Sequence, residues 1–288
     1  MLLKQEYTNH YQKIGFFPVS GLALEEINDT RYTSYIKILY LPENYELTVD
    51  FTTYKTRGAS LFFIGSDQFL RMDKGGESHG YFLYYNRDFY CIQIHDAEVA
   101  CDGLLFNNIY QLPVTEIPEE EDLIVSRIYE QIREEFSSEA SGQEEMLRTY
   151  LKQLIIRATR LWKRQNLGKL LEEPPGEIEF YRDFSRLVEI HFRQKHKVSD
   201  YAAMLGVAAK TLSNKFKRHG LISPNEVIKE RIVLEAKRLL HHTGWSVKQI
   251  AYDLGYDDPA YFNRLFTNKA GYSPAVFRQK YLSGKKVQ

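Results

Sequence analysis

The sequence is poor in the residues that build disulfide frameworks and membrane spans. Only two of its 288 residues are cysteines, Cys91 and Cys101, and neither has His or Cys neighbours at zinc-finger spacing, so we expect free thiols. No segment approaches 18 uncharged apolar residues, and the first seven residues lack the apolar core of a signal peptide. These absences predict a cytoplasmic protein that is not held in a membrane.

Residues arranged for catalysis are equally scarce. A metal site on neighbouring strands requires two histidines one residue apart, an acid and a distant third histidine, because the ligands must converge on one ion. The nearest set here is Glu77, His79 and His95, which lacks that spacing. We identify no nucleophile and base pair and no phosphate-binding loop. The sequence therefore predicts no metal, no cofactor and no enzymatic activity.

The chain has no net charge, but its charges are unevenly distributed. From Glu177 onward there are 20 Lys and Arg against 11 Asp and Glu, a formal charge of +9, and residues 1–176 carry −9. The C-terminal part is therefore the one suited to a polyanion. An apolar content of 43% is that of a globular protein, and 288 residues are enough for two domains with separate cores.

A helix-turn-helix pattern lies between Val247 and Pro274. Its first helix has one apolar face and ends at Gly255, and its second helix begins at Asp258 and Pro259. The Asp258 carboxylate can accept from the free amides of the first turn, and Pro259 loses no hydrogen bond there. The inward positions of the two helices are Ile250, Ala251, Leu254, Phe262, Leu265 and Phe266.

The same pattern occurs about 50 residues earlier, beginning at Val198. The step from Phe to Ser-Pro is seven residues in both copies, and the turn glycine recurs. The corresponding residues are Ala202 and Ala251, Leu205 and Leu254, Gly206 and Gly255, Phe216 and Phe266, and Ser223 and Ser273. An internal repeat of this kind predicts a two-module domain. A helix over residues 225–242, roughly 27 Å long, would separate the two second helices by about one turn of DNA.

With these residues the C-terminal part resembles the double helix-turn-helix domain of the AraC/XylS family of bacterial transcription regulators. The series I-A-x-x-L-G-Y, Y-F-x-R-x-F and G-Y-S-P carries the resemblance. It implies an all-α DNA-binding domain over residues 179–288, with modules at about 198–219 and 247–269. The implied partners are double-stranded promoter DNA and, for an activator, RNA polymerase. The residues do not distinguish activation from repression.

The resemblance also assigns DNA contacts to the second helix of each module. The positions that would face bases are Lys210, Ser213, Asn214, Ala260, Tyr261 and Arg264, with Asn263 beside them. Phosphate contacts are expected from Lys215, Lys217, Arg218, Thr267 and Lys269. Arg264 is the strongest candidate because its planar fork fits the two acceptors of guanine. Where the family usually has Ser or Thr as N-cap of the first recognition helix, this chain has Ala208, which cannot cap.

Residues 1–118 are predicted to form a β domain. Runs rich in Tyr, Phe, Ile, Val and Thr predict strands at 32–40, 45–54, 60–64, 80–85 and 88–95, arranged as a small antiparallel barrel or sandwich. The resemblance implies a cupin-like barrel that binds a small effector. Phe82, Tyr84 and Tyr85 are candidates for an effector pocket, although core packing explains them equally well.

Residues 119–169 are predicted to form two helices, at 119–136 and 143–165, followed by a linker at 170–178 that contains Pro174, Pro175 and Gly176. The second helix has a coiled-coil-like seam that predicts a homodimer interface, with packing inside the chain as the alternative. The seam residues are Leu147, Leu151, Leu154, Ala158 and Leu161.

Together these features predict an α+β protein that regulates transcription by binding specific DNA, as a homodimer and with a small effector in its N-terminal domain. Two alternatives stay open. In one, the N-terminal domain serves only dimerisation and no effector binds. In the other, the β domain is an enzyme and the DNA-binding part serves only to target it.

Overall fold

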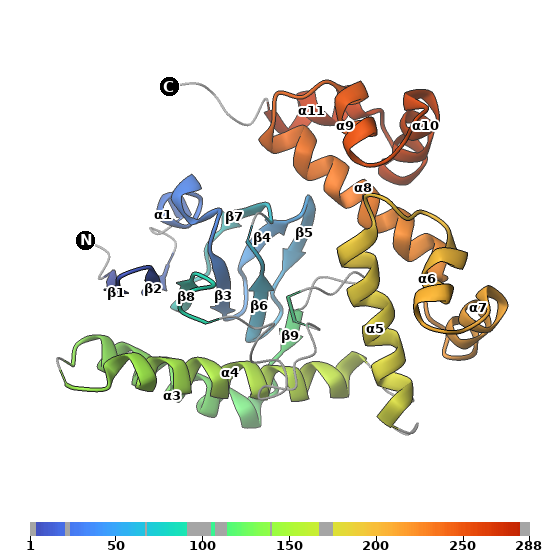
Figure 1. Ribbon diagram of the computed structural model, residues 1–288. Helices are drawn as coiled ribbons and strands as arrows, with labels where there is room; N and C mark the ends of the chain where they lie inside the picture. Colours follow the sequence, from blue (N-terminus) through green and yellow to red (C-terminus); the bar gives the residue numbers. More distant parts are fainter. Residues whose placement is uncertain are drawn as a thin grey trace. The chain divides into compact units, whose positions relative to one another are not determined.

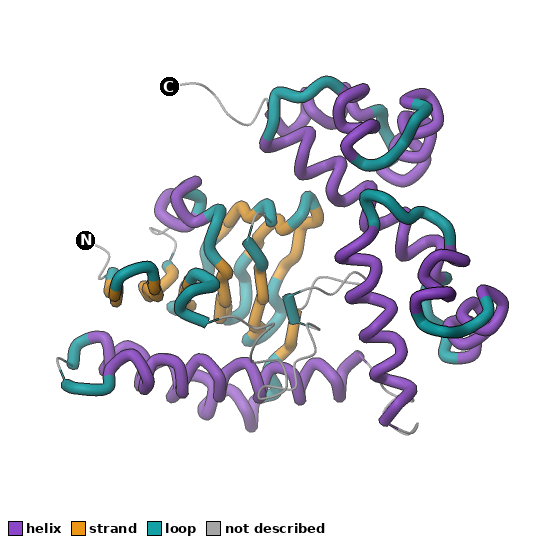
Figure 2. Tube along the Cα trace, viewed as in Figure 1, coloured by secondary structure: helices purple, strands orange, loops and turns teal. Residues whose placement is uncertain are grey.

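The computed structural model describes seven stretches of the chain, 4–20, 24–66, 68–90, 105–106, 114–138, 140–166 and 175–282. It divides into two compact units, Met1–Glu172 and Glu173–Gln288. Among the described residues all strands belong to the first unit, and the second consists of helices and loops (Figure 2). Cys91, Cys101, His95 and most of the linker expected at 170–178 lie outside the described residues.

The first unit contains two antiparallel sheets (Figure 1). The larger has the order β1 (Gln5–Asn9), β2 (Gln12–Val19), β8 (Gly80–Tyr85), β3 (Ile36–Leu41), β6 (Ser60–Ile64) and β9 (Val114–Glu116). The smaller has the order β5 (Thr52–Lys55), β4 (Glu46–Val49) and β7 (Leu70–Lys74). The prediction of antiparallel β structure is confirmed. The described strands do not close into a barrel, because β1 and β9 are the edge strands of the larger sheet and each pairs with a neighbour on one side only.

The strands of the larger sheet supply two hydrophobic cores. Because successive side chains point to opposite faces, Leu83 and Tyr85 lie in the core beneath the helices, whereas Phe82 and Tyr84 lie in the core beneath the smaller sheet. Strand β3 is buried on both faces, and its six residues accordingly form a continuous apolar run broken only by Lys37. Phe82, Tyr84 and Tyr85 therefore cannot line one effector pocket, and that prediction is wrong for this set of residues.

Two strands follow the sequence prediction residue by residue, and one divides differently. β6 and β8 match the predicted ranges 60–64 and 80–85. The segment 45–54, predicted as one strand, is the hairpin of β4 and β5, which turns at Asp50 and Phe51. Both have positive φ, 47° and 69°. The sequence gives little signal for this turn, because the turn contains no Gly, Pro or Asn, and other residues seldom adopt a positive φ.

Two antiparallel helices cover one face of the larger sheet, as Figure 1 shows, and both confirm their predictions. They are α3 (Glu119–Phe136) and α4 (Gln143–Asn166). The Tyr40 hydroxyl of β3 donates to Asp122 of α3 at 2.7 Å, which ties this helix to the sheet. Six described elements of the first unit were not among the expected strands: β1, β2, β7, β9, α1 (Leu24–Ile27) and the 3₁₀ turn η1 (Thr30–Tyr32).

The seam of α4 packs inside the chain. All five of its residues, Leu147, Leu151, Leu154, Ala158 and Leu161, are at most 2% exposed, and the first four belong to the core between the helices and the sheet. The alternative of packing within the chain is therefore what the structure has. These side chains cannot also form a dimer interface, because burial in one chain leaves no surface for a second.

The second unit is built around one central helix, α8 (Pro224–His242). In Figure 1, α5 (Pro175–His191), α6 (Val198–Met204) and α7 (Ala209–Arg218) lie toward its N-terminal end. The other three helices pack against its remaining length and are α9 (Val247–Asp253), α10 (Pro259–Ala270) and α11 (Pro274–Leu282). With 19 residues, α8 is about 28 Å long.

Candidate nucleic-acid interface

The first helix-turn-helix module consists of α6, a tight turn and α7. Gly206 in the turn has φ of 67°, in the left-handed region that favours glycine. Its amide donates to the Ala203 carbonyl at 3.1 Å, and the Val207 amide donates to Ala202 at 2.9 Å. These two bonds satisfy the last carbonyls of α6, so the chain leaves that helix in a fixed direction.

The second module repeats this turn between α9 and α10. Gly255 has φ of 77°, its amide donates to Tyr252 at 3.0 Å, and the Tyr256 amide donates to Ala251 at 2.9 Å. The internal repeat found in the sequence is therefore a repeat of backbone geometry. Gly255 meets a second demand that Gly206 does not, because a Cβ there would lie 2.2 Å from the carbonyl oxygen of Arg193, whereas a Cβ at Gly206 would meet nothing within 4 Å.

The helix caps follow the sequence prediction. The Asp258 carboxylate accepts from the Ala260 amide at 2.8 Å, with Pro259 at the first helical position of α10. Ser246 and Gln249 form a capping box at the start of α9. Ala208 precedes α7 and makes no side-chain cap. The start of α7 is thus held less firmly than the start of α10.

The outer face of α7 carries polar side chains while its inner face is buried. Leu212 and Phe216 are fully buried, whereas Lys210, Ser213 and Asn214 are exposed. The Ser213 hydroxyl donates back to the Ala209 carbonyl at 3.0 Å, which leaves its oxygen as an acceptor for a base edge. The three residues predicted to face bases therefore share one accessible face.

The outer face of α10 has the same organisation. Phe262 and Phe266 are fully buried, and the four predicted base-contacting residues, Ala260, Tyr261, Asn263 and Arg264, are exposed. The Arg264 side chain is 68% exposed, and its guanidinium lies 4.0 Å from the Asp258 carboxylate. An ion pair this exposed and long contributes little, so the guanidinium can exchange it for a base or a phosphate at small cost.

The residues predicted to contact phosphates differ in their surroundings. Lys217 and Arg218 are exposed in the last turn of α7, whereas the Lys215 ammonium lies 4.8 Å from the ring centroid of Phe180. The Thr267 hydroxyl donates to the Asn263 carbonyl at 2.8 Å. These four positions remain compatible with a backbone contact, because none is buried.

Lys269 has a different role from the one predicted for it. Its ammonium pairs with Glu226 and, at 3.5 Å, with Glu230, both on α8. The hydrogen bond from Lys269 lowers the pKa of Glu226, since it favours the charged carboxylate. The structure therefore uses Lys269 to hold α10 against α8, and this occupied cation is a poor candidate for a phosphate contact.

A network of charged side chains joins the two modules at α8. The Arg231 guanidinium donates to both oxygens of Glu189 on α5, at 2.6 and 2.9 Å, and to Glu235 at 3.0 Å. Arg193, just beyond α5, donates to Glu235 at 2.6 Å and also pairs with Asp253 of α9. We call these five residues the joint. Its links run from α5, the helix before the first module, through α8 to α9 of the second module.

Burial makes the joint different from a surface ion pair. The Arg231 side chain is 6% exposed, and its guanidinium carbon lies 3.9 Å from the ring centroid of Phe192. Burial by itself would raise the pKa of Glu189, but the hydrogen bond and charge of Arg231 lower it overall. The same pairing raises the pKa of Arg231 against the effect of its burial. Both groups are therefore held in their charged forms by each other.

A ring contact supplements the joint. The rings of His196 and Tyr256 stack with centroids 4.5 Å apart, beside Gly255 in the turn of the second module. Burial lowers the pKa of His196, which favours its neutral form. Sequence reasoning missed the joint and this stack. The only readable signal was Arg231 and Glu235 at i and i+4 on a helix, which does not reveal partners on α5 or α9.

Features that would point to another kind of site are not found in the described stretches. No group of three or more His, Cys, Asp or Glu residues there could hold a metal ion. Glu77 and His79 are both exposed. No helix in the described part of the chain has the length and apolar character needed to cross a membrane.

Comparison with known proteins agrees with the repeated fold of the second unit. Residues 201–280 match the family described as "Helix-turn-helix domain". The chain is 27% identical over 150 residues to the HTH-type transcriptional activator RhaS of Enterobacter sp. (strain 638), covering 52% of this chain and 50% of that one. It is 32% identical over 88 residues to histidine kinase P4 of Formosa agariphila, covering 31% of this chain and 6% of that one.

The alignment with a solved structure of ToxT spans nearly the whole chain. ToxT from Vibrio cholerae strain SCE256 has a TM-score of 0.44 and 13% identity, with 98% of this chain and 100% of that chain covered. In the sequence comparison the chain spans about half the length of the activator that it matches. The match to the kinase is confined to a small fraction of that protein, which indicates a shared module inside otherwise different proteins.

Proposed function

We propose that this chain, whose C-terminal unit is a helix-turn-helix domain of the AraC/XylS type, regulates transcription by binding specific promoter DNA. The single observation that carries the proposal is the repeated pair of helices α7 and α10. They sit in two modules with the same turn, joined by one helix, and each exposes polar side chains opposite a buried aromatic face. A recognition helix needs this arrangement to present donors and acceptors to a major groove.

The proposed mechanism uses both modules at once. α8 is about 28 Å long, close to the roughly 34 Å that separates successive major grooves on one face of DNA. The joint of Glu189, Arg193, Arg231, Glu235 and Asp253 opposes movement of α5 and α9 relative to α8, because such movement would separate the buried Arg231 from Glu189 and would separate Arg193 from Glu235 and Asp253. One chain would therefore read two groove segments at a set spacing.

Arg264 is proposed as the main base-reading residue, with guanine as its partner. Lys210 would also donate to guanine, and Asn214 would pair with adenine. Further contacts to bases are proposed for Ser213, Ala260, Tyr261 and Asn263. Phosphate contacts are proposed for Lys215, Lys217, Arg218 and Thr267, whose donors would fix the register of each helix.

The first unit is proposed to serve assembly and regulation. A homodimer would place four recognition helices on paired half-sites, and since the α4 seam is buried, the contact would use outward side chains of this unit. Activation through RNA polymerase is proposed because the RhaS relative is named an activator. We propose no catalytic activity. A small effector in the first unit is also proposed, and the alternative is a regulator without one.

The proposal is tested by selecting bound sequences from random duplex DNA with the full-length protein, at a stated salt concentration. The expected result is a long site with recurring half-sites, each containing two short conserved segments about one DNA turn apart. Binding without sequence enrichment, fading steeply as salt rises, would mean that only backbone electrostatics act and would overturn the proposal.

A further inference from the structure

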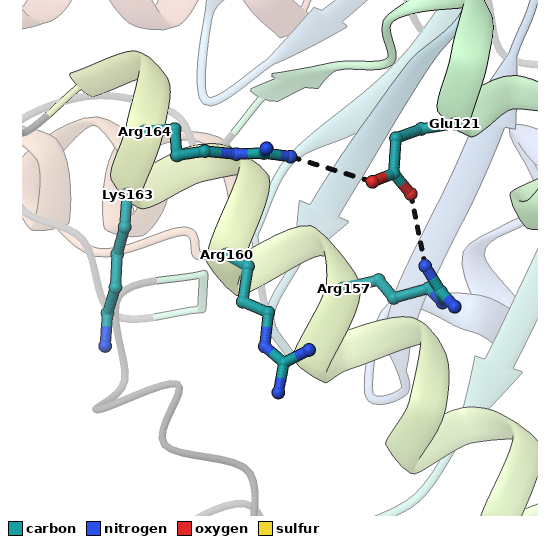
Figure 3. A pocket seen from close by; sticks show the side chains of 5 residues that line it. All are labelled: Glu121, Arg157, Arg160, Lys163 and Arg164. Atoms are coloured by element: carbon teal, nitrogen blue, oxygen red, sulfur yellow. Dashed lines mark hydrogen bonds and ion pairs between the residues drawn. The ribbon is translucent and has the colours of Figure 1, made fainter.

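A basic pocket lies between residues of α3 and α4 in the first unit, and its lining residues precede both helix-turn-helix modules in the sequence. It has a volume of about 470 Å³ and is lined by Glu121 of α3 and by four cationic side chains of α4. Those four are Arg157, Arg160, Lys163 and Arg164 (Figure 3). The lining thus carries a formal charge of +3, although residues 1–176 as a whole carry −9.

Helix geometry explains how these cations meet. Positions 157, 160 and 164 are three and four residues apart, so they lie on one face of α4 along about 10 Å of its axis. Leu154, Ala158 and Leu161, on an adjoining face of the same helix, are buried. Arg160 and Arg164 are exposed and Arg157 is partly buried, so the basic face reaches solvent.

The single acid of the pocket pairs with two of its four cations. The Glu121 carboxylate accepts from Arg157 at 3.2 Å and lies 3.7 Å from the Arg164 guanidinium. Figure 3 shows those two side chains directed toward Glu121, whereas Arg160 and Lys163 extend away from it. Arg160 is exposed and forms no ion pair with any residue in the described part of the chain.

The helix dipole does not account for the whole basic face. Cations in the last turn of a helix are stabilised by its carbonyl end, which explains Lys163 and Arg164. Arg157 and Arg160 lie farther from the end at Asn166, where this effect has faded. Like charges close together on one helix face repel each other, and a bound anion would relieve this repulsion.

We propose that this pocket binds a small organic anion with at least two negative charges, most suitably a phosphate ester. Guanidinium forks match phosphate oxygens in pairs. Arg157 uses one of its five donors on Glu121 and keeps the others available. The volume lies within the range of about 300–1,000 Å³ typical of small-molecule sites. The proposal does not depend on DNA binding by the second unit.

The test titrates the full-length protein with inorganic pyrophosphate by calorimetry at constant ionic strength. The variant Arg160→Gln removes the guanidinium that pairs with no described residue, and the matched control Arg127→Gln removes an exposed guanidinium of α3 outside the pocket. We expect Arg160→Gln to weaken pyrophosphate binding about tenfold and Arg127→Gln to leave it within about twofold. Any binding to the basic second unit is common to all three proteins and cancels.

The outcomes separate the possible ligands. Citrate that binds as tightly as pyrophosphate, with the same loss in Arg160→Gln, would support the site and assign it to polycarboxylates. Equal affinities in the wild type, Arg160→Gln and Arg127→Gln, or no binding to any of them, would overturn the proposal. Arg160→Gln could also weaken the binding of unrelated duplex DNA as much as it weakens the binding of pyrophosphate. In that case the basic face would be a nucleic-acid contact and the small-anion proposal would be wrong.

Discussion

Arg231 of α8 holds Glu189 of α5 by two hydrogen bonds, at 2.6 and 2.9 Å, across 42 residues of sequence. This pair joins the helix that precedes the first helix-turn-helix module to the helix that carries both modules. Since the guanidinium is almost fully buried, it stabilises the unit only while its acid partners remain. The packing of α5 against α8 therefore depends on this pair of charged side chains.

Replacing Glu189 by glutamine should lower the free energy of unfolding of the second unit by about 1–3 kcal/mol, because a charged hydrogen-bond partner of a buried guanidinium is lost. Urea unfolding measures this, with the fluorescence of Trp245 followed in a Trp162→Phe background, which leaves one tryptophan. The control is Asp183→Asn on the same helix, whose ion pairs are exposed and 3.9 Å long. Equal effects of the two variants would contradict a structural role for the pair.

The contribution of Glu189 should also depend on pH in one direction. Arg231 holds the pKa of Glu189 below its ordinary value of 4.5, despite burial that acts oppositely. A carboxyl whose pKa is lower in the folded state stabilises the fold above its unfolded pKa, and this stability is lost as pH falls through the folded pKa. The difference between wild type and Glu189→Gln should shrink below pH of about 4.5. A difference that stays constant or grows on acidification would count against this account.

The two turn glycines should respond differently to alanine. Both have positive φ, so each substitution should cost about 1–2 kcal/mol of backbone strain. Gly255→Ala adds a Cβ that would overlap the Arg193 carbonyl oxygen, and about 1–3 kcal/mol more is expected from that overlap. Gly206→Ala is the matched control, since its Cβ meets open space. The same urea experiment compares them, and equal destabilisation would show that the second module can shift freely.

Arg264→Ala should reduce discrimination at one base pair by about 1–3 kcal/mol, because its proposed paired contact to guanine is lost. Lys217→Ala is the comparison, since loss of a phosphate contact should weaken all sequences alike and reduce the salt dependence by about one ion. Binding is measured with the selected site and with its three single-base variants at the assigned position. An unchanged base preference in Arg264→Ala would remove that residue from the base-reading set.

Most of the second unit could be predicted from local sequence patterns. Glycine at 206 and 255 and the Ser-Pro steps at 223 and 273 mark helix ends through backbone rules that act within a few residues. The exposed faces of α7 and α10 followed from helical periodicity. The joint could not be predicted, because Glu189 and Arg231 meet only after the chain has folded.

In the first unit, one wrong prediction could have been avoided from the sequence, and one turn could not have been predicted. Alternation along β8 separates Phe82 and Tyr84 from Tyr85, so the sequence already argued against placing all three in one pocket. The hairpin at Asp50 and Phe51 was out of reach, because its turn uses positive φ without glycine or asparagine. The seam of α4 had two possible partners, and periodicity alone does not say whether a helix packs on its own sheet or on a second chain.

The central claim is that both modules of one chain bind DNA at the same time with a fixed spacing. Its most direct test compares the affinity for the selected half-site with the affinity for the same half-site carrying five extra base pairs between its two segments. This insertion turns one segment about half a helical turn to the opposite face of the duplex. The account predicts a loss of at least about 100-fold, to the level of a single module. Unchanged affinity would contradict it, because the two modules would then act independently.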